Sequence, residues 1–87
     1  MQNVDREIRS RVTALVRSIL AQNSITSDVA PDTLLVDIGL TSMDMVNLML
    51  GVEAEFDFTI PQEQITPENF QSLRTLERLV MDQLQAA

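Results

Sequence analysis

The sequence predicts a small all-α protein: a four-helix bundle of three long helices and one short helix, with a long loop between the first and second. Three segments repeat apolar residues at helical spacing. Only two glycines and three prolines occur among 87 residues, which argues against a turn-rich all-β fold. A chain of this length has room for a single domain, residues 1–87, and its 45% hydrophobic content is enough for one core.

The first helix is predicted from about Asn3 to Gln22. Asn3 can cap its start, and Asp5 and Glu7 suit the positive end of a helix dipole. At about 100° per residue, one stripe collects the apolar side chains of this segment. They are Val4, Ile8, Val12, Leu15 and Ile19.

A long connection, "NSITSDVAPDTLLVDIG", follows the first helix. Pro31 and the many Ser, Thr, Asp and Asn residues exclude a regular element from its first half. A structureless loop of this length is uncommon in a compact domain unless something holds it in place. We expect the apolar residues of its second half to pin it across the bundle: Leu34, Leu35, Val36, Ile38 and Leu40.

The second helix is predicted from about Ser42 to Phe56, and it carries two opposed apolar stripes instead of the usual one. One stripe consists of Met45, Leu48, Met49, Val52 and Phe56, and the other of Met43, Val46, Leu50 and Ala54. A fully buried helix is one explanation, but few elements remain to cover it. We therefore expect the second stripe to be at least partly exposed and used for docking, where Met side chains can repack around partners.

Two further elements complete the bundle. Phe58 and Ile60 alternate with polar neighbours, but Pro61 ends any strand quickly. Thr66, Pro67 and Glu68 follow the pattern of a cap, a first-turn proline and an acid, so a short third helix is expected there. The last helix is capped by Ser72, and its apolar stripe is Leu73, Leu76, Val80 and Leu84.

The residue types that are missing limit the chemistry of the protein. Cys, His and Lys are all absent, which removes thiolate nucleophiles, the commonest metal ligands, the commonest general base and a Schiff-base amine. The carboxylates are scattered over polar positions. We therefore expect a protein that is not an enzyme, with no catalytic residues and no metal site.

Charge and hydropathy predict the cellular location of the protein and the kind of surface that its partners present. Thirteen acidic residues face six basic ones, all Arg, for a net charge of −7. This charge disfavours nucleic acid and anionic membranes and favours partners with basic docking surfaces, although acidity also simply keeps a protein soluble. No apolar run reaches the roughly 18 residues of a membrane span, and the charged N-terminus lacks a signal peptide core. We expect a soluble cytoplasmic protein.

The stretch "DIGLTSMD" sets Ser42 apart from the other serines. Thr41 and Asp44 fit a capping box, so Ser42 lies in the first helical turn and is not needed as the cap. Its hydroxyl would project at a helix N-terminus, where free N–H groups and the dipole favour a phosphate. Gly39 can supply an unusual backbone angle to the incoming turn. An ordinary helix-start serine is the alternative.

The segment "DIGLTSMDMVNLMLGVEAEFDFTIP" resembles the second-helix region of acyl and peptidyl carrier proteins. Their signature is a Leu/Ile-Gly turn, then Asp-Ser-Leu, an amphipathic helix, Glu-x-x-Phe and Ile-Pro. The preceding loop and the downstream "ITPENFQSLRTLERLV" match as well. The resemblance implies an acyl-carrier-protein-like fold and a covalent 4′-phosphopantetheine arm on Ser42. A phosphopantetheinyl transferase would install that arm, whose thiol replaces the cysteine that the chain lacks.

Three positions depart from the usual pattern: Thr41 replaces Asp, Met43 replaces Leu, and Asn47 replaces the Glu of fatty-acid carriers. The pattern is most similar to discrete aminoacyl carrier proteins. Those are loaded by amino acid:[carrier protein] ligases that resemble class II seryl-tRNA synthetases and adenylate a small amino acid, typically glycine or alanine. The resemblance implies such a ligase as a partner, and an unidentified enzyme that accepts the cargo.

The resemblance also implies where partners dock. The expected docking face is the second helix with the end of the preceding loop, on a protein that is a monomer when free. Its expected contacts are Leu40, Thr41, Met43, Asp44, Val46, Asn47 and Leu50. A D-alanyl carrier and a specialised fatty-acyl or polyketide carrier remain as alternatives. A non-carrier adaptor with an acidic helical face would explain the second apolar stripe but not the glycine turn and the serine.

Overall fold

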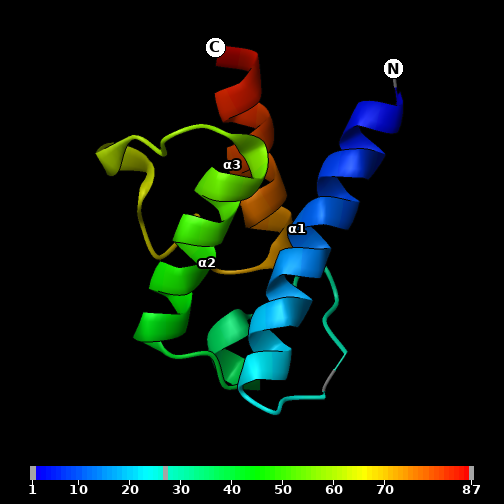
Figure 1. Cartoon of the computed structure of the whole chain (residues 1–87), viewed down its shortest axis with the longest axis vertical. Coiled ribbons are helices and arrows are strands. Elements are labelled where there is room, and N and C mark those ends of the chain that lie inside the picture. Colours follow the sequence, from blue (N-terminus) through cyan, green and yellow to red (C-terminus); the bar gives the residue numbers. More distant parts are fainter. Residues whose placement is uncertain (1, 27, 87) are drawn as a thin grey trace.

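The computed structural model describes residues 2–26 and 28–86, which fold into three α-helices. These are α1 (Gln2–Gln22), α2 (Ser42–Phe56) and α3 (Leu73–Ala86), and the two loops between them contain the short 3₁₀ helices η1 (Leu35–Ile38) and η2 (Gln62–Gln64). No strand occurs in these two stretches. The all-helical fold predicted from the sequence is confirmed, and α2 begins and ends at the predicted residues (Figure 1).

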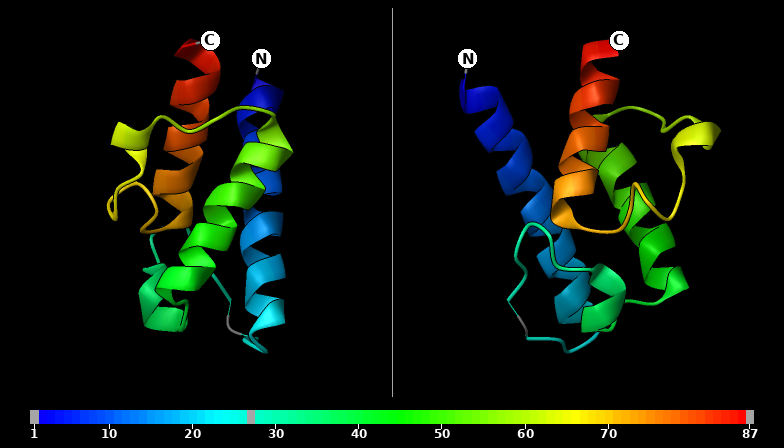
Figure 2. Two further views of the ribbon diagram at one scale, coloured as in Figure 1. Left: turned by 60° about the vertical axis from the view of Figure 1, so that its left-hand side comes forward. Right: turned by 180° about the vertical axis from the view of Figure 1, so that it is seen from behind.

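The helix α1 is the shared packing surface of the molecule. Both α2 and α3 pack against it, whereas α2 and α3 contact each other far less. The start of α1 and the end of α3 lie at one end of the molecule, and α2 begins at the opposite end, beside η1 (Figures 1 and 2). The space between α2 and the chain that leads into α3 is therefore not filled by helix–helix packing.

The core confirms the predicted stripes. Its fully buried side chains come from all three helices and from η1: Leu35, Leu48, Leu76, Val12, Val16, Val52 and Val80. Leu15, Met45 and Met49 are only partly buried against it, and Leu84 is exposed near the end of α3. The side chains of Asn3, Val4 and Asp5, named above for the first helix, lie outside the described residues.

The far end of α2 is fastened to α1 by Arg11. Its guanidinium donates to the Glu55 carboxylate at 2.7 Å and to the Glu55 carbonyl oxygen at 2.6 Å. The same group lies 4.5 Å from the centre of the Phe56 ring, within cation–π range. These contacts satisfy a carbonyl near the C-terminus of α2 and fix that end of the helix on α1.

The long loop is pinned as the sequence predicts, but part of it is regular. Leu35 is fully buried in η1, and its N–H donates to the carbonyl of Gln71 at 2.9 Å. At the start of α3, Arg74 donates its backbone N–H to the carbonyl of Pro31 at 2.9 Å and its guanidinium to both oxygens of Asp32. Loop and α3 thus form one unit at this end of the molecule.

The short helix expected from Thr66 is not formed in this structure. Residues 67–70 form consecutive turns, although the Thr66 hydroxyl accepts the N–H of Asn69 at 3.2 Å as a cap would. The turns end because Phe70 enters the core and the carbonyl of Gln71 is already bonded to Leu35. The helix α3 begins after Ser72. The Ser72 hydroxyl accepts the N–H of Thr75 at 3.3 Å, as expected of the predicted cap of α3.

Replacing Gly39 should destabilise the fold. Gly39 has φ 108°, and an added Cβ would lie 3.2 Å from the Cδ1 of Ile25. We expect Gly39→Ala to lose about 1–3 kcal/mol of unfolding free energy in urea titrations. The matched control is Gly51→Ala, because Gly51 is helical and an added Cβ there only approaches Leu15 at 3.4 Å. That control should be neutral or slightly stabilising, and an equal loss in both variants would contradict the strain at Gly39.

Candidate functional site

The start of α2 is closed by a reciprocal capping box. Thr41 has extended backbone angles, and its hydroxyl oxygen accepts the N–H of Asp44 at 3.2 Å. In return, the Asp44 carboxylate accepts the backbone N–H of Thr41 at 2.8 Å and its hydroxyl at 2.9 Å. The capping box predicted from the sequence is confirmed, and it satisfies the cap without the next residue.

Ser42, the first residue of α2, is therefore free of a structural task. Its side chain is exposed, and its hydroxyl has no hydrogen-bond partner among the side chains of residues 6–26 and 28–85 or the described backbone. Helix N–H groups in the first turn point outward here, and the helix dipole favours an anion at this end. The position suits a hydroxyl that carries a phosphate ester.

The Asp44 carboxylate is buried and stays charged. It is 8% exposed. The backbone N–H of Thr41, the side-chain amide of Asn23 and the hydroxyl of Thr41 all donate to its carboxylate and lower its pKa, in that order of effect. Asp44 is therefore a fixed anion that stabilises the start of α2.

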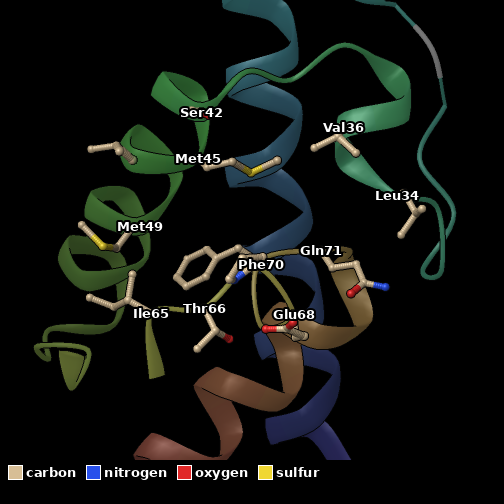
Figure 3. Close-up of a pocket in the computed structure, with 12 residues that line it drawn as sticks. Leu34, Val36, Ser42, Met45, Met49, Ile65, Thr66, Glu68, Phe70 and Gln71 are labelled. Atoms are coloured by element: carbon tan, nitrogen blue, oxygen red, sulfur yellow. The ribbon is translucent and has the colours of Figure 1, made fainter. Parts of the chain in front are cut away.

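An apolar groove of about 650 Å³ opens beside Ser42. One wall is the face of α2 that carries Ser42, Met45 and Met49, and the other wall is the chain from Ile65 to Gln71 (Figure 3). Leu34 and Val36 of the long loop stand at its end. The groove is open because α2 packs against α1 and makes few contacts with α3.

The second apolar stripe of α2 is exposed, as the sequence predicts. Met43 is 69% exposed, Val46 46% and Leu50 52%, and Asn47 lies on the surface beside them. We call Met43, Val46, Asn47 and Leu50 the docking face. Thr41 is also exposed at its edge.

Two residues named from the sequence as partner contacts are buried. Leu40 is 4% exposed and packs in the core, where it anchors the turn that precedes Thr41. Asp44 is occupied by the capping box. Their positions support roles in building the site, and the other five expected contacts, Thr41 and the docking face, are exposed.

Sequence reasoning missed three exposed apolar residues on the loops around Ser42. Val36 is 64% exposed, and Leu34 and Ile65 are also exposed. The sequence grouped Val36 with the residues that pin the loop. Because η1 turns at this point, Leu35 faces the core while Val36 faces outward, and a 3₁₀ turn among five apolar residues leaves no clear periodic signal.

Within residues 2–26 and 28–86, no group of three His, Cys, Asp or Glu residues could hold a metal ion. None of the helices described here is both long enough and apolar enough to cross a membrane.

The fold and this site define a class of protein. A small helical bundle with an uncommitted serine at the start of its second helix, beside an exposed apolar face, has the features of a carrier protein. The chain belongs to the phosphopantetheine attachment site family, which matches residues 10–80. Proteins of that family hold 4′-phosphopantetheine on a serine.

Within this family, the chain is similar to aminoacyl carrier proteins. The chain is 67% identical to aminoacyl carrier protein 1 of Bradyrhizobium diazoefficiens over 87 residues, which cover 100% of this chain and 97% of that protein. A chain in a crystal structure of Bradyrhizobium japonicum glycine:[carrier protein] ligase, complexed with its cognate carrier protein and an analogue of glycyl adenylate, is 69% identical. It superposes with a TM-score of 0.74 over 86% of this chain and 97% of that one.

A second structure of the same ligase contains glycylated carrier protein. A chain of that structure is 69% identical to this protein, with a TM-score of 0.72 over 83% of this chain and 97% of that one. Aminoacyl carrier proteins thus match this chain along nearly its whole length, as the resemblance in the sequence implied.

Acid should weaken the start of α2. The pKa of Asp44 is lowered in the folded state, so its stabilisation is present above the ordinary carboxyl pKa and is lost as pH falls through the folded value. We expect the unfolding free energy to fall below about pH 4. Asp32, whose pKa is lowered by Arg74, contributes in the same window. Asp32→Asn should retain part of the acid dependence, and Asp32→Asn with Asp44→Asn should flatten it, as measured by urea titration at several pH values.

Proposed function

We propose that Ser42 carries the 4′-phosphopantetheine arm, and that the protein holds an aminoacyl group on this arm and delivers it between partner enzymes. The observation that supports the attachment site is the exposed Ser42 hydroxyl in the first turn of α2, which the Thr41–Asp44 capping box leaves uncommitted. The arm supplies a thiol that holds its cargo as a thioester, a group that a chain without cysteine cannot provide itself.

The residues around Ser42 prepare the hydroxyl and stabilise the ester. Thr41 and Asp44 fix the first turn, so the Ser42 oxygen is held at the end of a complete helix. The free N–H groups of that turn and the helix dipole stabilise the negative charge of a phosphodiester. Leu40, buried behind the turn, keeps the serine on the surface.

The arm has to be installed by a phosphopantetheinyl transferase. The Ser42 oxygen forms a bond to the phosphorus of the pantetheine donor, and the bond from that phosphorus to the leaving group breaks. The serine proton passes to a base on the transferase, because this chain has no His, Cys or Lys to accept it.

The proposed cargo is an aminoacyl group, and glycine is the first candidate. Two crystal structures of related chains contain a glycine:[carrier protein] ligase, one of them with glycylated carrier protein. The proposed loading partner is a ligase of this kind, similar to class II synthetases. A D-alanyl, fatty-acyl or polyketide cargo would appear as a different mass on the same arm.

The docking face indicates the chemistry of the partner surface. Its centre is apolar, since Met43, Val46 and Leu50 are exposed there. No basic residue occurs between Arg17 and Arg74, whereas nine acidic residues do. They are Asp28, Asp32, Asp37, Asp44, Glu53, Glu55, Asp57, Glu63 and Glu68. A partner with an apolar centre and a basic rim fits this surface.

We further propose that the chain is a single carrier domain that acts in the cytoplasm as a monomer when free. One core joins α1, α2, α3 and η1. A cytoplasmic location fits a cargo activated as an aminoacyl adenylate, because forming that adenylate consumes ATP. An acceptor enzyme must then take the cargo.

Replacing Ser42 should abolish attachment and leave the fold intact. Ser42→Ala keeps the Thr41 cap, so its melting temperature should stay close to that of the unchanged protein. After co-expression with a broad phosphopantetheinyl transferase, the unchanged protein should gain the mass of one arm and Ser42→Ala should gain none. Thr41→Ala is the control: it should lose about 1 kcal/mol of stability and still gain the arm at the endpoint of co-expression, which does not report the rate of transfer. An arm on Ser42→Ala would reject the site, and an unmodified parent protein would favour the adaptor alternative.

A charge in the docking face should block loading without unfolding the protein. Val46→Asp should fold, because the side chain is 46% exposed. It should lower the rate of glycine loading onto the arm by about tenfold or more, since an unpaired charge would be buried against the ligase. The matched control is Ala14→Asp, which adds the same charge at an exposed position of α1 and should load normally.

A second control separates docking from folding. Leu48 is fully buried, so Leu48→Asp should unfold the domain in a thermal melt. Normal loading of folded Val46→Asp would place recognition outside the docking face. A steep loss of loading with salt in the unchanged protein would assign more of the contact to the acidic residues.

A further inference from the structure

A side-chain amide links the end of α1 to the start of α2. Asn23 follows the last residue of α1, and its Nδ2 donates to the carbonyl oxygen of Ile19 at 2.9 Å. The same nitrogen donates to Oδ1 of Asp44 at 3.1 Å. The two hydrogens of one amide group thus join the C-terminal end of one helix to the N-terminal cap of another, 21 residues away in the sequence.

The backbone holds Asn23 in place although its side chain is largely exposed. Its own N–H lies 3.0 Å from the carbonyl oxygen of Leu20. The next residue, Ser24, takes a left-handed angle of φ 58°, and the N–H of Ile25 returns to the carbonyl of Leu20 at 2.9 Å. These backbone hydrogen bonds at the C-terminus of α1 fix the direction in which the Asn23 amide points, toward Asp44.

The hydrogen bonds to Asp44 are divided between its two oxygens. Oδ2 accepts the N–H and the hydroxyl of Thr41, and Oδ1 accepts Asn23. If the Asn23 amide were removed, Oδ1 of Asp44 would lose its hydrogen-bond donor while remaining buried. The Asp44 carboxylate would then be free to rotate toward another donor. Thr41 would move with it, and Thr41 is bonded covalently to Ser42.

We propose that Asn23 is a positioning residue for the Ser42 site: acting through Asp44 and Thr41, it orients the serine hydroxyl for transfer of the arm. The proposal rests on the attachment site proposed above. It assigns a role to a residue on a different helix, outside the capping box and the docking face. The sequence around Asn23 reads only as the end of a helix, so this contact is visible only in the folded chain.

The experiment compares arm transfer to Asn23→Ala with transfer to the unchanged protein, both starting without the arm. The readout is kcat/KM of a fixed transferase, followed by intact mass. We expect a loss of about tenfold or more, the scale seen when a hydrogen bond supporting a functional side chain is removed. The matched control is Asn69→Ala, because the Asn69 amide donates to the carbonyl oxygen of Gln64 at 2.7 Å and makes no hydrogen bond to Asp44 or Ser42.

A second readout checks that the Asn23–Asp44 hydrogen bond has been lost, so that the transfer rate can be compared at a known change in this bond. The Asn23 amide lowers the pKa of Asp44, so NMR titration of the Asp44 carboxyl should give a higher pKa in Asn23→Ala than in the unchanged protein. Asn69→Ala should lower the melting temperature without moving that pKa or slowing transfer. A purely structural role for Asn23 predicts the same rise in the Asp44 pKa and a lower melting temperature, but no loss of transfer to the folded variant.

A third variant makes the effect reversible. In Asn23→Asp the introduced carboxyl has the shape of the amide, but it can donate to Asp44 only when protonated. Transfer relative to the unchanged protein, measured at each pH, should be slow at neutral pH and recover as pH falls toward about 5. The defect of Asn23→Ala should not recover. If Asn23→Ala fails to fold, this pH-dependent rescue still tests the proposal.

The outcomes separate this inference from the proposed function. Transfer to folded Asn23→Ala within about twofold of the unchanged protein, or an equal loss in Asn69→Ala, overturns the positioning role. Ser42→Ala remaining unmodified in the same assay keeps the attachment site standing in either case. An arm on Ser42→Ala would instead reject the attachment site, and the role of Asn23 with it.

Discussion

The capping box between Thr41 and Asp44 is the interaction on which the rest of the site depends. A helix N-terminus has several unsatisfied N–H groups, and the first suitable side chain is normally used to satisfy one of them. Here Thr41 accepts the Asp44 N–H, and Asp44 accepts the Thr41 N–H in return. Ser42 is consequently left over: it lies at the positive end of a complete helix with its hydroxyl uncommitted. A phosphate ester at that position has a favourable field and displaces no structural contact.

The way in which α2 is held explains why its outer side is available. Asn23 ties its start to α1, and Arg11 ties its end to α1. The buried Leu48 and Val52 lie between these ties. With both ends fastened to one neighbour, α2 does not need α3 for support. The groove beside Met45 and Met49 and the exposed docking face both follow from this one-sided packing.

Much of the fold could be predicted because its local signals agree with its packing. The stripe Ile8, Val12, Ile19 and the cap at Ser72 both predicted helices that the structure contains. The failures lie where tertiary contacts override local signals. The pattern from Thr66 indicates a helix start, yet burial of Phe70 and the bond from Leu35 to Gln71 end the turn early. Leu40 was named both as a residue that pins the loop and as a partner contact, and it is buried in the core after the left-handed turn at Gly39, which fits the first role.

The proposed attachment site explains how the protein can act without Cys, His or Lys. A protein without Cys, His or Lys has no side chain able to form a thioester, accept a proton near neutral pH or form an imine. In the proposed function, the thiol comes from the arm and the transfer chemistry comes from partner enzymes. What the chain itself has to provide is one hydroxyl in a fixed position and a surface that several enzymes can recognise. Exposed Met43 beside a stretch with no basic residue suits that task, because Met adapts to different partners while the surrounding acids orient each approach.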